Sequence, residues 1–210
     1  MNIFYGLKPV IKFENKQNSQ TALHIFHQNI WGLEHKMDEL MCMLDSCDLS
    51  PRIIFLLEHY LVDHKLLMIK PNKYYLASRF SCQSHSGGGV CMYSNSYLEN
   101  NMIDLSQYCI EKVIEECAVQ INIGNCFIIL LCIDRFPSGN FGKFAVHLDL
   151  ILKYLCKPKV EFFICGDFNV NFLIYSSSAQ QLTLLLQSYN LFHIIDFPTR
   201  MTKVSSSAIW

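Results

Sequence analysis

Residues 160–169 of the sequence read VEFFICGDFN, and this stretch indicates the kind of fold that the chain adopts. Residues 160–165 are a short apolar run, which is typical of a strand buried inside a sheet. Two polar residues, Asp167 and Asn169, stand just after the run. Ligands gather at such strand ends in α/β proteins. The stretch therefore predicts a buried strand that delivers functional side chains to one rim of a sheet.

Two earlier apolar runs repeat this pattern. Residues 23–29 are a strand candidate that ends in Asn29, and residues 52–57 are a second candidate that delivers Glu58. If these ends share one rim with residues 167–169, two carboxylates and two amides converge there. Such a set suits a hard cation, since Mg²⁺ takes one or two carboxylates and keeps water or substrate oxygens. The chemistry predicted is metal-assisted hydrolysis of a phosphoester.

Each of these polar residues also has a purely structural interpretation. A Gly-Asp-x-Asn sequence after a strand often forms only an Asx turn. Glu58 is equally consistent with a solvated strand end, and Asn29 with a turn former. The spacing of the residues leaves both interpretations open.

Strands and helices alternate along the rest of the chain. Two hairpins are expected, one from residues 74–80 and 88–94 around a polar Ser/Gly segment, and one from residues 117–123 and 126–134 around Gly124-Asn125. Apolar stripes at helical spacing predict helices over residues 33–44, 141–155 and 182–189, the second capped by Asn140. Residues 191–195 are expected to form a last strand. This order predicts a mixed α/β fold with a sheet-on-sheet core and helices outside.

The composition is that of one compact domain. The chain has 210 residues, 51% of them hydrophobic and 17% charged, and a chain of this length buries roughly 70% of its unfolded surface. Residues 1–20 are expected to be an irregular lead-in, and residues 21–210 the domain. The net charge of −1 creates no overall field that attracts nucleic acid, so any such binding needs a local groove.

The cysteines and the apolar runs bear on the cellular compartment. Ten cysteines are present without a Cys-x-x-Cys motif, and several lie in apolar runs, where a thiol behaves as a small hydrophobe. We expect reduced cysteines and an intracellular protein, in the nucleus or cytoplasm. The longest apolar run, residues 127–133, is far shorter than a membrane span needs. No signal peptide is recognised, so we expect neither secretion nor a membrane partner.

Eight segments, in the same order along the chain, match one known family. The chain resembles the endonuclease domain of non-LTR (LINE-type, jockey-like) retrotransposons, a branch of the endonuclease/exonuclease/phosphatase superfamily that includes DNase I. The segments are residues 27–32 (HQNIWG), 56–61 (LLEHYL), 87–93 (GGGVCMY), 116–119 (ECAV), 135–140 (RFPSGN), 165–171 (CGDFNVN), 197–200 (FPTR) and 205–209 (SSSAI). The resemblance implies a four-layer α/β/β/α sandwich over residues 21–210 with the final strands missing.

The resemblance also implies roles for single residues. Glu58 would hold Mg²⁺, or Mn²⁺ in its place, and Asn29 would help to position the metal and the scissile phosphate. Asp167 would orient or deprotonate the attacking water, Asn169 would hold the phosphate, and Thr199 would contact the substrate. The implied activity is cleavage of a phosphodiester in duplex DNA, which nicks one strand. The metal would neutralise the phosphate while a carboxylate places the nucleophile in line.

Three departures from the family bear on activity. Asp134 stands where the family usually has a tyrosine that contacts phosphate, and a carboxylate there repels phosphate unless a cation intervenes. Trp210 stands where an aspartate usually follows Ser-x-Ile. The terminal Ser-Asp-His element is absent, so we expect a truncated product with impaired activity, since loss of an acid/base group costs about 10²- to 10⁴-fold. The alternative is a non-catalytic remnant that is inert or binds nucleic acid or a protein partner.

Overall fold

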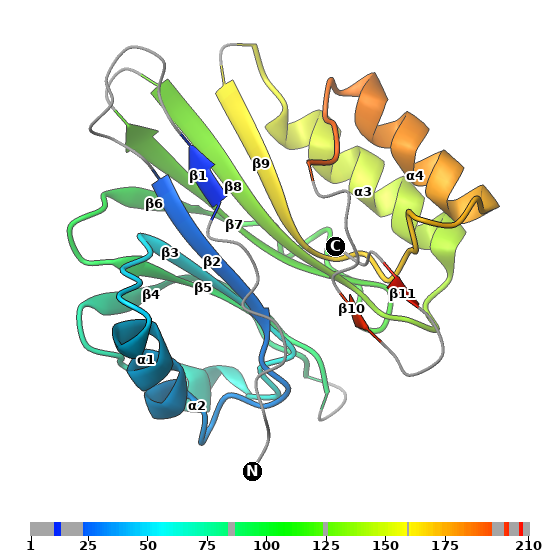
Figure 1. Ribbon diagram of the computed structural model, residues 1–210. Coiled ribbons are helices and arrows are strands. Elements are labelled where there is room, and N and C mark those ends of the chain that lie inside the picture. The colour runs from blue at the N-terminus through cyan, green and yellow to red at the C-terminus, as the bar shows by residue number, and fades with distance from the viewer. Residues whose placement is uncertain are drawn as a thin grey trace.

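Two β-sheets stack face to face, and helices cover the outer face of each (Figure 1). The computed structural model describes residues 11–13, 23–83, 87–123, 126–158, 160–194, 200–201 and 206–207. The layers follow the order helix, sheet, sheet, helix, which confirms the predicted α/β/β/α sandwich. A buried hydrophobic cluster fills the space between the sheets, and two further clusters lie beneath the helices.

Among the described residues, the first sheet has five strands in the order β1-β2-β3-β5-β4. β2 and β3 pair in parallel, and the other neighbours are antiparallel. All five residues of β3 are buried, as expected of a central strand that is covered on both faces. The strands are β1 (Ile11–Phe13), β2 (Leu23–Asn29), β3 (Ile53–Leu57), β4 (Tyr74–Phe80) and β5 (Val90–Asn95).

The second sheet, as far as the structure describes the chain, has four strands in the order β6-β7-β8-β9. β8 and β9 are parallel, and the other pairs are antiparallel. The strands are β6 (Asn100–Ile103), β7 (Ile114–Ile123), β8 (Cys126–Arg135) and β9 (Val160–Asp167). A separate antiparallel pair is formed by β10 (Arg200–Met201) and β11 (Ser206–Ser207).

Side chains alternate between the two faces of this second sheet. Cys117 and Val119 of β7 belong to the cluster between the sheets, whereas Ala118 packs in the cluster beneath the helices. The same alternation places Cys132 of β8 between the sheets and Ile133 under the helices. A residue's position in its strand therefore decides which layer it faces.

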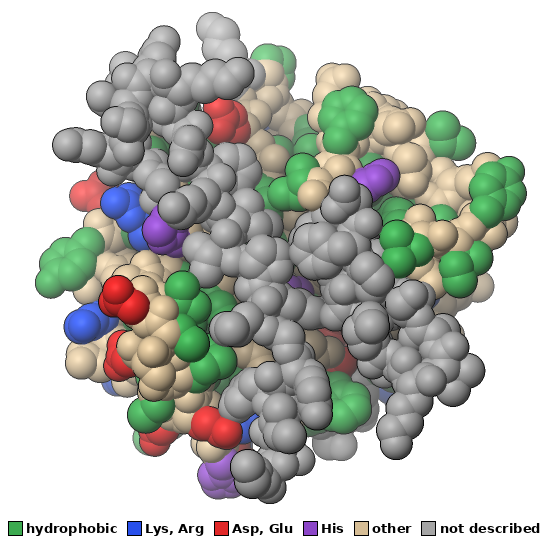
Figure 2. All heavy atoms as spheres, in the orientation of Figure 1, with side chains coloured by type: hydrophobic (Ala, Val, Ile, Leu, Met, Phe, Trp, Pro, Cys, Tyr) green, Lys and Arg blue, Asp and Glu red, His purple; other side chains and the backbone are tan. Residues whose placement is uncertain are grey.

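In the described part of the chain, four helices complete the layers: α1 (Met37–Ser46) and α2 (Asp63–Leu66) on the first sheet, and α3 (Phe141–Leu155) and α4 (Ser177–Ser188) on the second. The side chains of Asn140 and Ser176 accept hydrogen bonds from the first turns of α3 and α4, at 2.9 and 3.1 Å, which stabilises those helix starts. α4 buries Leu182 and leaves Leu184 mostly exposed. Hydrophobic side chains accordingly show on the surface over α4 in Figure 2.

Both predicted hairpins and all three predicted helices are present. Two expectations need correction. Ile11–Phe13 forms a strand inside the expected irregular lead-in, because it pairs with β2. Residues 191–194 form no strand, since Phe192 and Ile194 point to solvent instead of a neighbouring strand. The short elements α2 and β6 were not predicted.

Several expectations concern residues outside the described part of the chain. These are the turn at Gly124-Asn125, the contact residue Thr199 and the departure at Trp210. The domain boundary near residue 21 and the missing final strands stay predictions. The ten cysteines all lie in the described part and form no disulfide with one another there; the reduced state stays a prediction. Within the described ranges, no helix combines the length and the apolar character that crossing a bilayer requires.

Candidate active site

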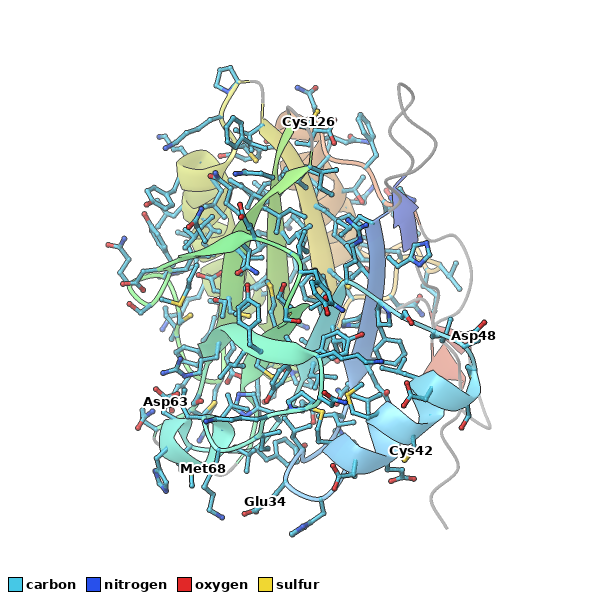
Figure 3. All side chains as sticks on the ribbon, turned by 90° about the vertical axis from the view of Figure 1, so that its left-hand side faces the viewer. Glu34, Cys42, Asp48, Asp63, Met68 and Cys126 are labelled. Carbon is cyan, nitrogen blue, oxygen red and sulfur yellow. The ribbon has the colours of Figure 1, made fainter. Side chains whose placement is uncertain are left out.

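The polar strand ends lie at one end of the space between the sheets. Asn29 closes β2, Glu58 follows β3, and Asp167 closes β9. β9 contacts both β2 and β3 across the sandwich, which brings these ends toward each other. Figure 3 shows Glu34 and Asp63, which follow the β2 and β3 ends in the chain, at one extremity and Cys126, where β8 begins, at the other.

Asn29 and Glu58 are in direct contact. The Asn29 Nδ2 donates a hydrogen bond to Glu58 Oε1 at 2.5 Å, and the Tyr60 hydroxyl donates to Glu58 Oε2. The Asn29 Oδ1 atom is buried and has no hydrogen-bond partner in the described chain. An unpartnered oxygen beside a carboxylate is costly unless a donor or a cation approaches. This pair of oxygens therefore suits a hard cation.

Asp167 and Asn169 form a local turn that a neighbouring arginine holds. The Asn169 backbone N–H donates to Asp167 Oδ1 at 2.9 Å, which is the Asx-turn geometry that the sequence also suggested. Asn169 Nδ2 donates to the Arg135 carbonyl at 2.6 Å. The Arg135 guanidinium in turn donates to the carbonyls of Phe168 and Asn169, at 2.6 and 2.9 Å. These bonds fix the direction of the Asp167 carboxylate.

His59 is a buried support behind Glu58. Its Nδ1 accepts the backbone N–H of Leu61 and its Nε2 lies 3.0 Å from the Phe80 carbonyl. Because a carbonyl can only accept, Nε2 carries the proton and the ring is neutral. Burial lowers the pKa of His59 to about 4. The imidazole ring is thus held in one position and is neutral at neutral pH. The backbone carbonyls of His59 and Glu58 accept hydrogen bonds from the N–H groups of Leu33 and Gly32, which fixes the segment after β2.

The segment Gly88-Gly89 lies beside His59 and forms hydrogen bonds to residues of both sheets. The Gly89 N–H donates to Glu115 Oε2 of β7 at 2.6 Å, and the Gly88 and Gly89 carbonyls accept from Tyr60 and His59. Both glycines have positive φ, and a Cβ on Gly89 would lie 2.4 Å from His59 Nε2. The glycine run forms the predicted connection between β4 and β5, and its composition follows from this close approach.

Three carboxylates form a row across the second sheet, which we call the acidic row: Glu115, Asp134 and Asp167. Asp134 pairs with Glu115 on one side and with Asp167 on the other. Burial raises the pKa of Asp134 well above the usual range of an aspartic acid. The negative charges of Asp167, Glu115 and Glu58 raise this pKa further. Asp134 therefore interacts electrostatically with carboxylates at the ends of both sheets.

The donor set suits a divalent cation that keeps several waters. The described residues contain no group of three or more His, Cys, Asp or Glu side chains that could hold a metal ion. A cation with one or two carboxylates, one amide oxygen and several waters still fits, and this is the set that Mg²⁺ accepts. Glu58 and the unpartnered Asn29 Oδ1 are the residues that fit such an ion.

Comparison with known proteins supports this architecture. Neither a protein-family model nor a curated protein matches the sequence. Among solved structures, the endonuclease domain of TRAS1, a telomere-specific non-LTR retrotransposon, is similar with a TM-score of 0.65 and 14% identity, over 88% of this chain and 82% of that one. The AP endonuclease LMAP from Leishmania major is similar at 0.55 and 12%, over 79% and 66%. The chain has the DNase I-like fold.

A third DNase I-like structure is the 3′ phosphatase NExo from Neisseria bound to a product DNA hairpin, with a TM-score of 0.53 and 14% identity over 78% of this chain and 70% of that one. The resemblance stated from the sequence is therefore confirmed at the level of the fold. Within this DNase I-like fold, the structure joins Asn29 to Glu58 and Asp167 to Asn169. Thr199 lies outside the described residues.

Sequence reasoning missed four residues of the DNase I-like rim: Tyr60, His59, Glu115 and Arg135. Tyr60 and His59 follow Glu58 directly, so their position next to a candidate ligand was an available signal. Glu115 had none, because only the pairing of β7 with β8 places it beside Asp134. Arg135 belongs to a segment that carries the resemblance, but nothing local indicates which carbonyls its guanidinium contacts.

Proposed function

We propose that this chain is a DNA nuclease domain that hydrolyses a phosphodiester with the help of Mg²⁺, with Mn²⁺ as a substitute, and so nicks one strand of duplex DNA. The observation that carries the proposal is the convergence of strand ends from both sheets. Asn29 and Glu58 meet at 2.5 Å on one sheet, and the Asp167–Asn169 turn closes the other. The origin that we propose for the domain is a non-LTR retrotransposon.

Glu58 and Asn29 are the residues that would hold the cation. When bound, the cation supplies positive charge that neutralises the phosphate. The Tyr60 hydroxyl and the Asn29 amide each donate to one Glu58 oxygen, which orients the carboxylate. Such supporting contacts restrict a ligand to one geometry, which favours binding.

Asp167 is the residue that would orient the attacking water and take its proton. The Asn169 N–H fixes one of its oxygens, and the Arg135 contacts fix the turn itself. The Asn169 side chain uses one N–H on the Arg135 carbonyl, and its NH₂ group carries a second N–H suited to a phosphate oxygen. Thr199 stays a proposed substrate contact.

The similar structures support DNA as the substrate class. They include an endonuclease domain of a retrotransposon, an AP endonuclease and a phosphatase bound to a DNA hairpin. The net charge of −1 means that a cation and local contacts, more than an overall field, must bring the phosphate to the rim.

A plasmid-nicking assay tests the proposal. Purified protein is incubated with supercoiled DNA in Mg²⁺ and in EDTA, beside Asp167→Asn, which keeps the acceptor for the Asn169 N–H. We expect Mg²⁺-dependent nicking that falls at least about 10²-fold in the variant. Asp104→Asn, on a surface loop after β6, is the matched control and is expected to nick normally.

Two outcomes would contradict the proposal. Nicking that persists in EDTA or in Asp167→Asn would place the activity elsewhere. Absence of nicking by wild-type protein with a cooperative unfolding transition would favour the non-catalytic alternative, and DNA binding would then be measured separately by fluorescence anisotropy.

A further inference from the structure

The carboxyl group of Asp134 lies at the centre of the acidic row. Its neighbours on the adjacent strands are Glu115 and Asp167, and all three occupy strand positions that face the opposite sheet, as Cys117, Cys132 and Cys165 do. Asp134 is only 7% exposed and Glu115 only 2%. The centre of the row is therefore screened from solvent and points toward the Glu58 side of the rim.

The hydrogen bonds leave Asp134 as the uncompensated member of the row. Glu115 accepts from the Gly89 N–H at 2.6 Å and from the Cys82 thiol at 2.9 Å, and Asp167 accepts from the Asn169 N–H. From the residues that the structure describes, no hydrogen bond and no ion pair reaches the Asp134 carboxyl. A buried carboxylate of this kind is normally paired or bound to a metal.

The basic residue next to Asp134 does not balance it. Arg135 follows in β8 and so faces the other side of the sheet. Its guanidinium donates to the Phe168, Asn169 and Gly139 carbonyls and lies 5.8 Å from the centre of the Phe144 ring. The charge of Arg135 lowers the pKa of Asp134 from a distance, but no described side chain forms an ion pair with this carboxyl, so a bound cation would supply a partner that the described side chains do not.

We propose that Asp134 is a ligand of the divalent cation, together with Glu58 and the unpartnered Asn29 Oδ1. This inference rests on the proposed function and deepens it, because it assigns a second carboxylate to the cation. Two carboxylates and one amide oxygen leave the remaining positions to water or a phosphate oxygen, as Mg²⁺ requires. Without a metal, the Asp134 carboxylate would repel phosphate; with a metal, it strengthens metal binding. This site therefore depends on its cation more strongly than a site with tyrosine at residue 134.

Direct metal binding tests the inference without any use of activity. Mn²⁺ binding is measured by electron paramagnetic resonance, and Mg²⁺ binding by calorimetry, on wild type, Asp134→Asn, Asp134→Tyr and Glu58→Gln. We expect the Kd to rise at least about tenfold in both Asp134 variants and in Glu58→Gln. Glu116→Gln is the matched control, since Glu116 is also a buried carboxyl group on the same sheet but faces the helices, and the Kd of this variant should equal that of wild type.

The outcomes separate this inference from the proposed function. A Kd raised in Glu58→Gln but unchanged in the Asp134 variants would overturn the inference alone. A Kd unchanged in all of them would overturn the cation site, and with it the proposed function. In EDTA, loss of Asp134 should relieve repulsion in the row, so the variants should unfold at the same urea concentration as wild type or higher. Unfolded Asp134 variants in EDTA would assign Asp134 a structural role and contradict the inference.

Discussion

Three residues of the rim share a backbone conformation that side chains rarely adopt. Glu58, Tyr60 and Asn169 have φ values of +53°, +59° and +49°. Asparagine tolerates this left-handed region, but the same conformation is strained for a glutamate or a tyrosine. Hydrogen bonds hold these residues in place, from Tyr60 N–H to the Gly88 carbonyl and from Gly32 N–H to the Glu58 carbonyl. Strain of this kind concentrates at functional sites.

His59 makes the stability of the protein depend on pH. Its pKa is about 4 in the folded state and about 6.5 in an unfolded chain, so only the unfolded chain binds the proton between these values. The stabilisation is complete above pH 6.5 and is lost as the pH falls toward 4, by up to about 3 kcal/mol. In urea unfolding, the difference in free energy between wild type and His59→Gln should shrink by this order from pH 7 to pH 4.

The exposed His64 of α2 provides the control for this prediction. His64→Gln should show the same pH dependence as wild type. A wild-type advantage over His59→Gln that is constant from pH 7 to pH 4 would contradict the neutral buried histidine.

Glu116 is a second buried titratable residue, and burial of its carboxyl group destabilises the folded protein. It is 2% exposed, both carboxyl oxygens lack a hydrogen-bond partner in the described chain, and burial raises its pKa well above the usual range. Replacing an unsatisfied buried group by an apolar one of similar volume is stabilising. Glu116→Met should raise the free energy of unfolding by about 1–3 kcal/mol, measured by urea denaturation at pH 7. A lower free energy than that of wild type would show that the carboxyl group has a stabilising partner.

At the scale of the elements, the β8–β9 pair decides where the catalytic aspartate candidate lies. Gly166 precedes Asp167 and is the register partner of Ile133. A Cβ on Gly166 would lie 1.8 Å from the Ile133 carbonyl oxygen, which is far inside van der Waals contact. The close approach of the two strands therefore depends on glycine at this position.

Gly166→Ala should separate these strands and displace Asp167. We expect a loss of about 3 kcal/mol of stability, the upper range of overpacking, together with weaker nicking. The comparison is Gly142→Ala in the first turn of α3, where the nearest atom to a new Cβ is Asn140 Oδ1 at 3.3 Å and alanine favours the helix by up to about 1 kcal/mol. Equal stability of the two variants in urea would refute the close-approach argument.

At the scale of the whole molecule, the two sheets meet at an end rich in negative charge. Glu58 and the acidic row contribute four carboxyl groups to this end, whereas the whole chain carries a net charge of only −1. Proximity of like charges opposes the compact state, and a bound cation offsets that repulsion. The cation should therefore stabilise the folded protein as well as support the chemistry.

Thermal unfolding in Mg²⁺ and in EDTA measures this coupling. At a Mg²⁺ concentration of 100 times the Kd, the expected stabilisation is about 2.7 kcal/mol, seen as a higher Tm. Potassium chloride at matched ionic strength separates specific binding from charge screening. A Tm that rises equally with either salt would contradict a specific cation site.

The fold was largely predictable from the sequence because its signals are local. Alternating and buried apolar runs located β2, β3 and the two hairpins, and apolar stripes located α1, α3 and α4. The pairs Asn29 with Glu58 and Asp167 with Asn169 followed from their place at strand ends. The strand expected over residues 191–195 was wrong for residues 191–194, because apolar residues that stay exposed there mimic a buried run.

The sequence by itself determined the positions of most strands and helices, the polar residues at their ends and the resemblance to a DNase I-like domain. Only the tertiary structure decided that Glu115, Asp134 and Asp167 form one row, that His59 lies behind Glu58, and that Arg135 holds the Asp167–Asn169 turn. The reason is physical: strand order and register are set by contacts between residues far apart in the chain. Glu115 and Glu116 are neighbours in the sequence and are both 2% exposed, yet the strand directs Glu115 between the sheets beside Asp134 and Glu116 toward the helices.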